Sequence, residues 1–183
     1  MMNTKLVKWR TNSGFTLVEF MVVAAIIAIL AGVGIPAFSR WLPNYRLKSA
    51  ATDIFSNMQL AKMEAVKNNS SVSIQFNPAA PGSYDLIDSA NNTIKTVNFA
   101  DYDDKGNIEW GWGNATKNIS GNPFSSGGEI AYSSNKLTLN PRGTGNGGTV
   151  YIQNQYGRSY AIGTLVSGVI RLRKWNESSG EWE

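Results

Sequence analysis

The 183-residue sequence contains no cysteine and no histidine. Without cysteine the chain forms no disulfide bond and has no thiolate chemistry, so an exported domain must fold without covalent cross-links. Without histidine it lacks the commonest general base and the commonest metal ligand, and a Ser–His–Asp triad is excluded. We therefore expect no catalytic residue, no metal site and no cofactor, and a membrane-anchored hydrolase is the least favoured class of function.

Positive charge is concentrated near the start of the chain. Lys5, Lys8 and Arg10 precede Gly14 with no acidic residue among them. The formal net charge of the whole chain is +4, but after the first fourteen residues 14 basic side chains face 13 acidic ones. The basic character therefore belongs mostly to this leader, and it gives little support to a nucleic-acid-binding protein.

A run of twenty residues without a charged side chain extends from Phe20 to Ser39. As a helix it would span roughly 30 Å, the thickness of a bilayer core. A cleaved signal peptide and a buried core helix are the alternatives. Two features oppose a signal peptide: the run is long for a signal-peptide core, and no small-x-small cleavage site with a polar start follows it. A buried core helix is disfavoured because so small a domain cannot enclose twenty uncharged residues. Basic residues flank both sides, so they do not decide the orientation.

Glu19 lies near the start of this run, where an ionisable group is unfavourable by a few kcal/mol. It needs a partner, supplied either by another copy of the chain or by a new amino terminus made by cutting nearby. Ser13-Gly14, the sequence from Phe15 to Glu19 and the apolar run with Pro36 resemble the type IV prepilin motif. This resemblance implies cleavage between Gly14 and Phe15, N-methylation of Phe15, and pairing of Glu19 with the terminal amine of a neighbouring subunit.

An amphipathic pattern follows the apolar run. Apolar residues recur at spacings of three and four, which predicts a helix packed on a sheet, and they are Leu47, Ala51, Ile54, Met58, Ala61 and Ala65. The opposite face carries Lys48, Asp53, Asn57, Lys62 and Glu64. Asn68-Asn69 is a candidate helix end, because asparagine accepts left-handed backbone angles.

Beyond residue 70 the period changes to two, which predicts strands. We expect them at 72–76, 84–87, 93–99, 137–139, 149–152, 160–166 and 169–175. Residues 100–129 are less regular and are interpreted as a long loop or a variable insertion. The fold class predicted is α+β: a long N-terminal helix, with a membrane half and an amphipathic half, packed on an antiparallel β-sheet head.

The C-terminal part resembles the GspH/FimT family of type IV pilin-like proteins. The residues that carry the resemblance are Asn140 to Gly143, Gly147 to Val150, Gly157-Arg158 and Arg171 to Arg173. It implies the pilin fold, divided into a prepilin leader at 1–14, a transmembrane half-helix at 15–38, an amphipathic half-helix at 39–69 and a β-rich head at 70–183. It also implies that the chain is no enzyme.

The implied function is that of a structural minor pilin or pseudopilin, in a type II secretion pseudopilus or a type IV pilus. The implied partners are other pilin or pseudopilin subunits, the prepilin peptidase and methyltransferase, an inner-membrane assembly platform and membrane lipids. The leader would lie in the cytoplasm and the head in the periplasm of a bacterium, before the chain enters a periplasmic or surface fibre.

DNA binding for natural transformation is the alternative function. Arg171, Arg173 and Trp175 alternate along one predicted strand, so two guanidinium groups and an indole share a face that suits phosphates and a base. Some FimT-type pilins bind DNA through a Gly-Arg-x-Arg motif. This chain departs from that motif, because Val169 and Ile170 separate Gly168 from Arg171. The competing interpretation is a solvated face on an edge strand, where charges discourage sheet-to-sheet pairing.

Two further motifs are interpreted as structural. Asp101, Asp103, Asp104, Gly106 and Glu109 resemble a calcium loop, but Lys105 and Trp112 occupy positions where ligands belong, so a solvent-exposed loop is expected. A calcium site built from other loops stays open. The glycine-rich segment at 141–148 lacks the Gly-Lys-Ser/Thr ending of a phosphate loop and no helix follows, so a bulged turn is expected.

Overall fold

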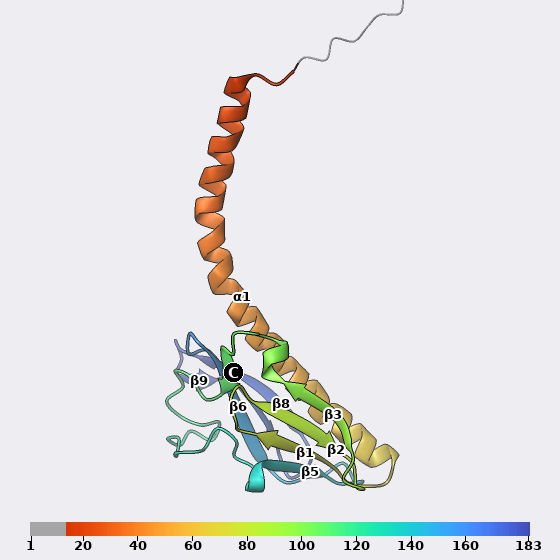
Figure 1. Ribbon diagram of the computed structural model, residues 1–183. Helices are drawn as coiled ribbons and strands as arrows, with labels where there is room; N and C mark the ends of the chain where they lie inside the picture. The colour runs from red at the N-terminus through yellow and green to blue at the C-terminus, as the bar shows by residue number, and fades with distance from the viewer. Residues whose placement is uncertain (1–13) are drawn as a thin grey trace, which may run out of the picture. The chain divides into compact units, whose positions relative to one another are not determined.

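The structure is a computed structural model that describes residues 14–183, and the leader residues before Gly14 lie outside this range. One long helix, α1, runs from Leu17 to Lys67 (Figure 1). The chain divides into two compact units between Arg40 and Trp41. We describe each unit by itself.

Helix α1 ends as the Asn68-Asn69 pair predicts. Asn69 has a φ of 48°, in the left-handed region. The Ser70 N–H donates to the Ala65 carbonyl at 3.1 Å and the Asn69 N–H donates to the Val66 carbonyl at 3.3 Å. These two bonds satisfy carbonyls at the helix end in the Schellman pattern and turn the chain back towards the first strand.

Nine strands form two antiparallel sheets within residues 14–183 (Figure 1). The four-stranded sheet has the order β3-β2-β1-β5, with β1 at Val72–Asn77, β2 at Ser83–Ile87, β3 at Thr93–Asn98 and β5 at Lys136–Leu139. The five-stranded sheet has the order β4-β6-β7-β8-β9, with β4 at Ile108–Trp110, β6 at Gly148–Asn154, β7 at Ser159–Thr164, β8 at Ile170–Asn176 and β9 at Glu181–Trp182. Two short 3₁₀ helices, η1 at Phe99–Asp101 and η2 at Ser133–Asn135, lie between strands. The predicted α+β fold is confirmed.

The apolar stripe of α1 forms one wall of the main core. Leu47, Ile54 and Met58 are at most 1% exposed, and they share a cluster with side chains of both sheets, among them Phe76 and Ile152. Burial of a side chain of this size contributes about 1.5–3 kcal/mol. The stripe predicted from the sequence is therefore the surface that joins α1 to the head.

The other face of the five-stranded sheet has a smaller core of its own. Val150, Ile152 and Ile162 face the main core, whereas the alternating residues Tyr151 and Ala161 belong to the second cluster. That cluster also contains Ala115, Trp175 and Trp182, with Trp112 and Phe124 packed against it. The segment 112–124 thus covers part of a sheet face that would otherwise be exposed.

Two expectations about the head were wrong. Residues 100–129 are not a loop throughout, because they contain part of η1 and the strand β4, which pairs with β6. Asn57 was assigned to the face of α1 opposite the apolar stripe, but it is 3% exposed and lies on the buried side. Both errors arise because tertiary contacts, which the local sequence pattern does not show, enclose these residues. Strand β4 is only three residues long, too short to show a period, and a polar residue such as Asn57 is normally expected in solvent.

Candidate functional site

The first turn of α1 is closed by a reciprocal cap between Thr16 and Glu19. The Thr16 N–H and the Thr16 hydroxyl each donate to Glu19 Oε2 at 2.8 Å, and the Glu19 N–H donates to Thr16 Oγ1 at 3.2 Å. This is a capping box, in which two side chains satisfy amides that the helix leaves unpaired. The Thr-x-x-Glu spacing signals it in the sequence, but the sequence analysis considered for Glu19 only a cationic partner, from another copy of the chain or from a new amino terminus.

Gly14 and Phe15 lie in non-helical backbone just before α1. Space is open around the Gly14 α-carbon, and the Phe15 side chain is 83% exposed. The peptide bond between them therefore lies outside the helix. Residues Leu17–Pro36 form the single helix in the described part of the chain that is long and apolar enough to cross a bilayer, with mean hydropathy 2.6 and no buried residue.

Arg171 and Arg173 line a groove of about 500 Å³ above β7. Cross-strand registry puts Thr149, Gly163 and Arg171 in one row and Tyr151, Ala161 and Arg173 in the next. Because Gly163 has no side chain, the space over β7 stays open between Thr149 and Arg171, whereas Ala161 is buried in the second cluster. The Arg171 side chain is exposed and makes no hydrogen bond or ion pair with residues 14–183.

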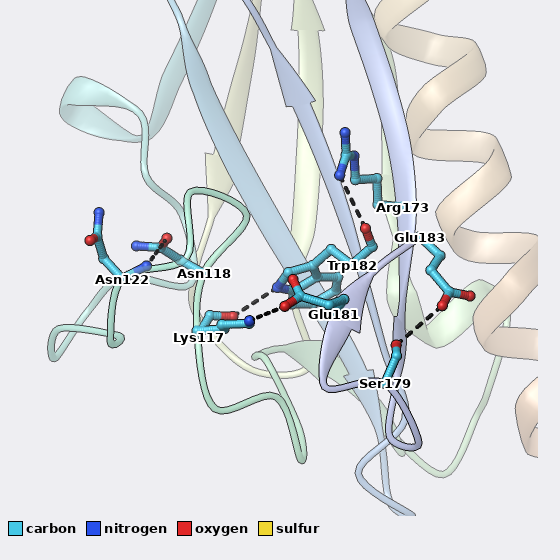
Figure 2. Close-up of polar contacts among 8 residues, drawn as sticks. All are labelled: Lys117, Asn118, Asn122, Arg173, Ser179, Glu181, Trp182 and Glu183. Carbon is cyan, nitrogen blue, oxygen red and sulfur yellow. Dashed lines mark hydrogen bonds and ion pairs between the residues drawn. The ribbon is translucent and has the colours of Figure 1, made fainter.

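Trp175 does not belong to this groove surface. It is 6% exposed, and its ring meets that of Trp182 at 5.3 Å in an edge-on arrangement. The hairpin β8–β9 that produces this contact also brings the Trp182 carbonyl to Arg173 Nη1, at 3.0 Å (Figure 2). A base therefore cannot stack on Trp175 here. Strand β9 pairs only with the end of β8, at Trp175 and Asn176, so β8 is still an edge strand where it carries Arg171.

The acidic segment 101–109 is organised around a buried ion pair. Asp103 is 2% exposed, and its Oδ1 accepts a hydrogen bond from Arg46 Nη1 at 2.9 Å, while Asn107 Nδ2 donates to Oδ2 at 2.9 Å. The expectation of a solvent-exposed loop was wrong for Asp103, because its carboxylate is buried and its ion pair with Arg46 joins the loop to α1. Within residues 14–183, no cluster of three or more His, Cys, Asp or Glu side chains has metal-binding geometry.

The glycine-rich segment 141–148 forms a turn, as expected. Asn140 and Thr144 are joined by a backbone hydrogen bond of 2.7 Å, and Gly143 has a φ of 73°. The Asn146 side chain holds the turn against β5 by accepting from the Thr138 N–H at 2.6 Å and donating to the Lys136 carbonyl at 2.8 Å. These bonds give the segment a structural role.

A polar network under α1 was not predicted. Asn57 Nδ2 donates to the Tyr84 hydroxyl at 2.7 Å, Lys95 Nζ donates to Asn57 Oδ1 at 3.1 Å, and the Tyr102 hydroxyl donates to Asp53 Oδ2. Burial raises the pKa of both Tyr84 and Tyr102 well above the usual value. Both phenols therefore stay neutral at physiological pH. Tyr84 accepts from Asn57 and also donates to Asp53 Oδ2 at 3.4 Å, and the network positions the helix on the four-stranded sheet.

Comparison with known proteins places these features in a family. The model of the family described as type II transport protein GspH matches residues 50–168, well over half of the chain. A prokaryotic N-terminal methylation motif matches residues 9–35, which include Gly14, Phe15 and Glu19.

Individual relatives match shorter stretches. The prepilin peptidase-dependent protein D of Escherichia coli (strain K12) is 56% identical over 41 residues, 22% of this chain and 25% of that protein. The pilin-like protein PilA1 of Thermus thermophilus is 32% identical over 78 residues, 42% of this chain and 48% of that protein. The chain thus covers only a quarter to about half of these curated relatives.

Among solved structures, the type IV minor pilin FimU of Pseudomonas aeruginosa (strain PAO1) is similar with a TM-score of 0.45 and 19% identity, covering 78% of this chain and 96% of that one. The match of the family model over residues 50–168 is the finding that assigns the family. The chain belongs to the family of type II transport protein GspH.

Proposed function

We propose that this chain is a structural minor pilin or pseudopilin, a subunit of a type II secretion pseudopilus or a type IV pilus, and no enzyme. It would be cut between Gly14 and Phe15 and N-methylated on Phe15. Residues 1–14 would be the leader, 15–38 the membrane half of the helix, 39–69 its amphipathic half and 70–183 the head. The apolar helix and the family fit a protein anchored in the bacterial inner membrane, and we place the head in the periplasm.

The observation that carries this proposal is the arrangement at the start of α1. The Gly14–Phe15 bond, outside the helix, leads directly into an apolar helical segment with no buried residue, and the acidic side chain of that segment lies one turn from its start. An exposed apolar surface of this length requires either lipid or other helices. The same surface therefore serves first as a membrane anchor and then as the contact between subunits in a fibre.

The proposed partners follow from this arrangement: other pilin or pseudopilin subunits, the prepilin peptidase and methyltransferase, an inner-membrane assembly platform and membrane lipids. In the fibre, the α-amine of Phe15 on one subunit would pair with Glu19 of its neighbour. A counter-ion supplied in this way would offset the cost of a carboxylate in an apolar environment.

Processing is tested by co-expressing the full chain with a prepilin peptidase and measuring the mass of the mature amino terminus. We expect a chain that begins with N-methylated Phe15. A Gly14→Leu variant should keep the leader, because a bulky side chain next to the cut bond obstructs the peptidase, whereas Ser13→Ala should be processed. A mature chain that still begins at Met1 beside an active peptidase would overturn the proposal.

DNA capture is the second candidate function, and the exposed Arg171 guanidinium in its groove is the observation that favours it. The head offers no broad positive field, since residues 70–183 contain 9 basic and 10 acidic side chains. Binding through this groove should therefore be weak and salt-sensitive. Arg171→Ala with Arg173→Ala should abolish it and Arg142→Ala should not; unchanged affinity in the double variant removes this candidate.

Membership of one fibre type is a separate question with a separate test. Deleting the gene and scoring exported enzymes, surface fibres and transformation in the same strain distinguishes the possibilities. A secretion defect alone indicates a pseudopilus, a loss of fibres indicates a pilus, and a loss of transformation with normal fibres indicates the DNA-binding role.

A further inference from the structure

A hollow of about 340 Å³ lies at the start of the head, between α1 and the strands β7 and β8. Trp41, Tyr45 and Lys48 contribute to it from α1, and Arg158 and Lys174 contribute from the sheet side. Tyr160 of β7, directly opposite Lys174 in β8, completes the sheet side. We call this hollow the aromatic–basic groove; all of it lies within the unit that begins at Trp41.

The aromatic side of the groove is an exposed stack. The rings of Trp41 and Tyr45 lie 5.1 Å apart at an interplanar angle of 23°, one helical turn from each other, and the two residues are 55% and 56% exposed. Tryptophan and tyrosine are enriched where a protein crosses the bilayer–water interface, because each has an apolar body and a polar group.

The basic side of the groove carries three exposed cations: Lys48, Arg158 and Lys174. The ion pairs within residues 14–183 are Arg46–Asp103, Lys67–Glu64 and Lys117–Glu181, so these three cations take part in none of them. No acidic residue lines the groove. Glu177 and Glu183 line the neighbouring hollow, which Arg158 and Lys174 also border, but neither carboxylate is within ion-pair distance of them. The groove therefore presents unneutralised charge that suits an anion.

The chain itself limits how far this groove can lie from the end of the apolar segment. Trp41 follows Pro36, the last residue of the candidate membrane span, by five residues of the same helix. Five residues rise about 7.5 Å in a helix and reach at most roughly 18 Å when extended. The headgroup layer on each side of a bilayer is about 5–8 Å thick. Because α1 is helical throughout this stretch, Trp41 is held at about the level of the headgroups. Tyr45, nine residues after Pro36, lies at most about 13.5 Å from the end of the span, at the outer edge of the headgroup layer.

We propose that the aromatic–basic groove binds the phosphate headgroup of an anionic phospholipid, with Lys48, Arg158 and Lys174 around the phosphate and the Trp41–Tyr45 stack against the glycerol and first acyl carbons. This inference rests on the membrane residence of the apolar helix in the proposed function. The contact holds the head against the bilayer surface before the subunit is extracted into a fibre, and it is lost on extraction.

The test uses the full chain in nanodiscs that contain equal amounts of phosphatidylglycerol and phosphatidylcholine. Lipids that stay bound to the released protein are counted by native mass spectrometry. The unmodified chain should retain phosphatidylglycerol preferentially. Each basic residue near a bilayer surface is worth about a fivefold factor in binding, so the variant Lys48→Gln/Arg158→Gln/Lys174→Gln should lose a preference on the order of 100-fold.

Two matched variants separate the groove from general charge. Lys67→Gln/Lys105→Gln/Arg142→Gln removes the same charge from exposed positions outside the groove, and it should keep the lipid preference. Lys48→Arg/Lys174→Arg keeps the charge inside the groove and should also keep it. Equal retention of the two lipids by the unmodified chain, or an equal loss in the control variant, overturns the proposal.

Two further measurements distinguish failure of the lipid proposal from failure of the proposed function. If the full chain does not float with vesicles, the membrane residence in the proposed function is wrong, independently of the headgroup ratio. If the chain floats but millimolar inorganic phosphate displaces the retained phosphatidylglycerol, the groove is a free-phosphate site and the lipid source is wrong. Flotation together with a phosphate-resistant preference that the groove variant abolishes supports the proposal.

Discussion

Thr16 and Glu19 are joined by three hydrogen bonds that close the first turn of α1. The carboxylate that the sequence interpretation assigned to a neighbouring subunit thus has a function within its own chain. Only Oε2 accepts the Thr16 donors, so Oε1 is available to a second donor. Capping and pairing with an incoming amine are therefore compatible, and substitutions can separate them.

The first prediction separates charge from capping. Glu19→Gln keeps an oxygen that can complete the capping box but removes the charge, whereas Thr16→Ala removes the capping hydroxyl, at about 1 kcal/mol, and keeps the charge. If an α-amine is the partner, Glu19→Gln and Glu19→Ala should both fail to enter fibres, while Thr16→Ala should enter them. The measurement is the fraction of mature subunit recovered in sheared fibres. Normal incorporation of Glu19→Gln would contradict the charge-pairing account.

The second prediction concerns the buried pair Arg46–Asp103. Asp103 is almost fully enclosed, so Arg46→Met would leave a buried carboxylate without its cation. We expect a loss of about 2–3 kcal/mol in the free energy of unfolding, at the low end for buried pairs because Asn107 still donates to Asp103 and Arg46 is one-third exposed. Chemical denaturation of the full chain in detergent measures it.

Lys67→Met is the control for that prediction. Its pair with Glu64 spans 3.7 Å and Lys67 is 73% exposed, so the cost should stay below about 0.5 kcal/mol. Adding Asp103→Asn to Arg46→Met should recover part of the stability, because a neutral amide replaces the unpaired charge. Equal losses in the free energy of unfolding for Arg46→Met and Lys67→Met would show that the Arg46–Asp103 pair contributes no more than a surface ion pair.

The third prediction concerns alkaline pH. Burial of Tyr132 raises its pKa to about 12, although hydrogen bonding with Thr164 opposes the shift. The unfolded chain has a tyrosine pKa near 10, so it releases this proton first. The stability linked to Tyr132 is therefore complete below about pH 10 and declines as the pH rises to about 12, by roughly 2 kcal/mol.

Tyr132→Phe tests this linkage. Thr164 Oγ1 still donates to the Asn146 carbonyl at 2.8 Å, so removal of the phenol oxygen leaves no unpaired hydroxyl. Between pH 9 and pH 12 the variant should lose about 2 kcal/mol less stability than the unmodified chain, as measured by denaturant titration at each pH. Parallel pH profiles would show that Tyr132 does not contribute to the alkaline loss.

The fourth prediction compares two glycines that both have a positive φ angle. Gly168, in the β7–β8 turn, has a φ of 78°, and a Cβ there would lie 1.7 Å from the Gly143 carbonyl oxygen. Gly180, in the β8–β9 turn, has a φ of 64° and open space around it. Gly180→Ala should cost about 1–2 kcal/mol for the left-handed backbone, and Gly168→Ala about 1–3 kcal/mol more for the clash. Equal melting temperatures for the two variants would contradict this.

Several features of the fold follow from local pattern. The three-four spacing from Leu47 to Ala65 predicted the buried face of α1, and the asparagine pair after Lys67 predicted its end. Alternating apolar residues predicted most strands of both sheets, because the pleat sends successive side chains to opposite faces. The boundaries of β4 and β9 lacked such a signal, since strands of two or three residues are too short to show a period.

At the candidate sites, the sequence by itself determined the motif residues Gly14, Phe15 and Glu19 at the start of the apolar helix, and the pair of guanidinium groups of Arg171 and Arg173 on one strand. Only the tertiary structure decided that Trp175 is buried beneath Trp182, that Asp103 is paired with Arg46, and that Trp41 and Lys174 border one hollow. The physical reason is the separation along the chain of the residues that interact. Helix and strand periods depend on neighbours within one turn or one pleat, whereas burial and ion pairing depend on residues that are brought together from distant parts of the chain.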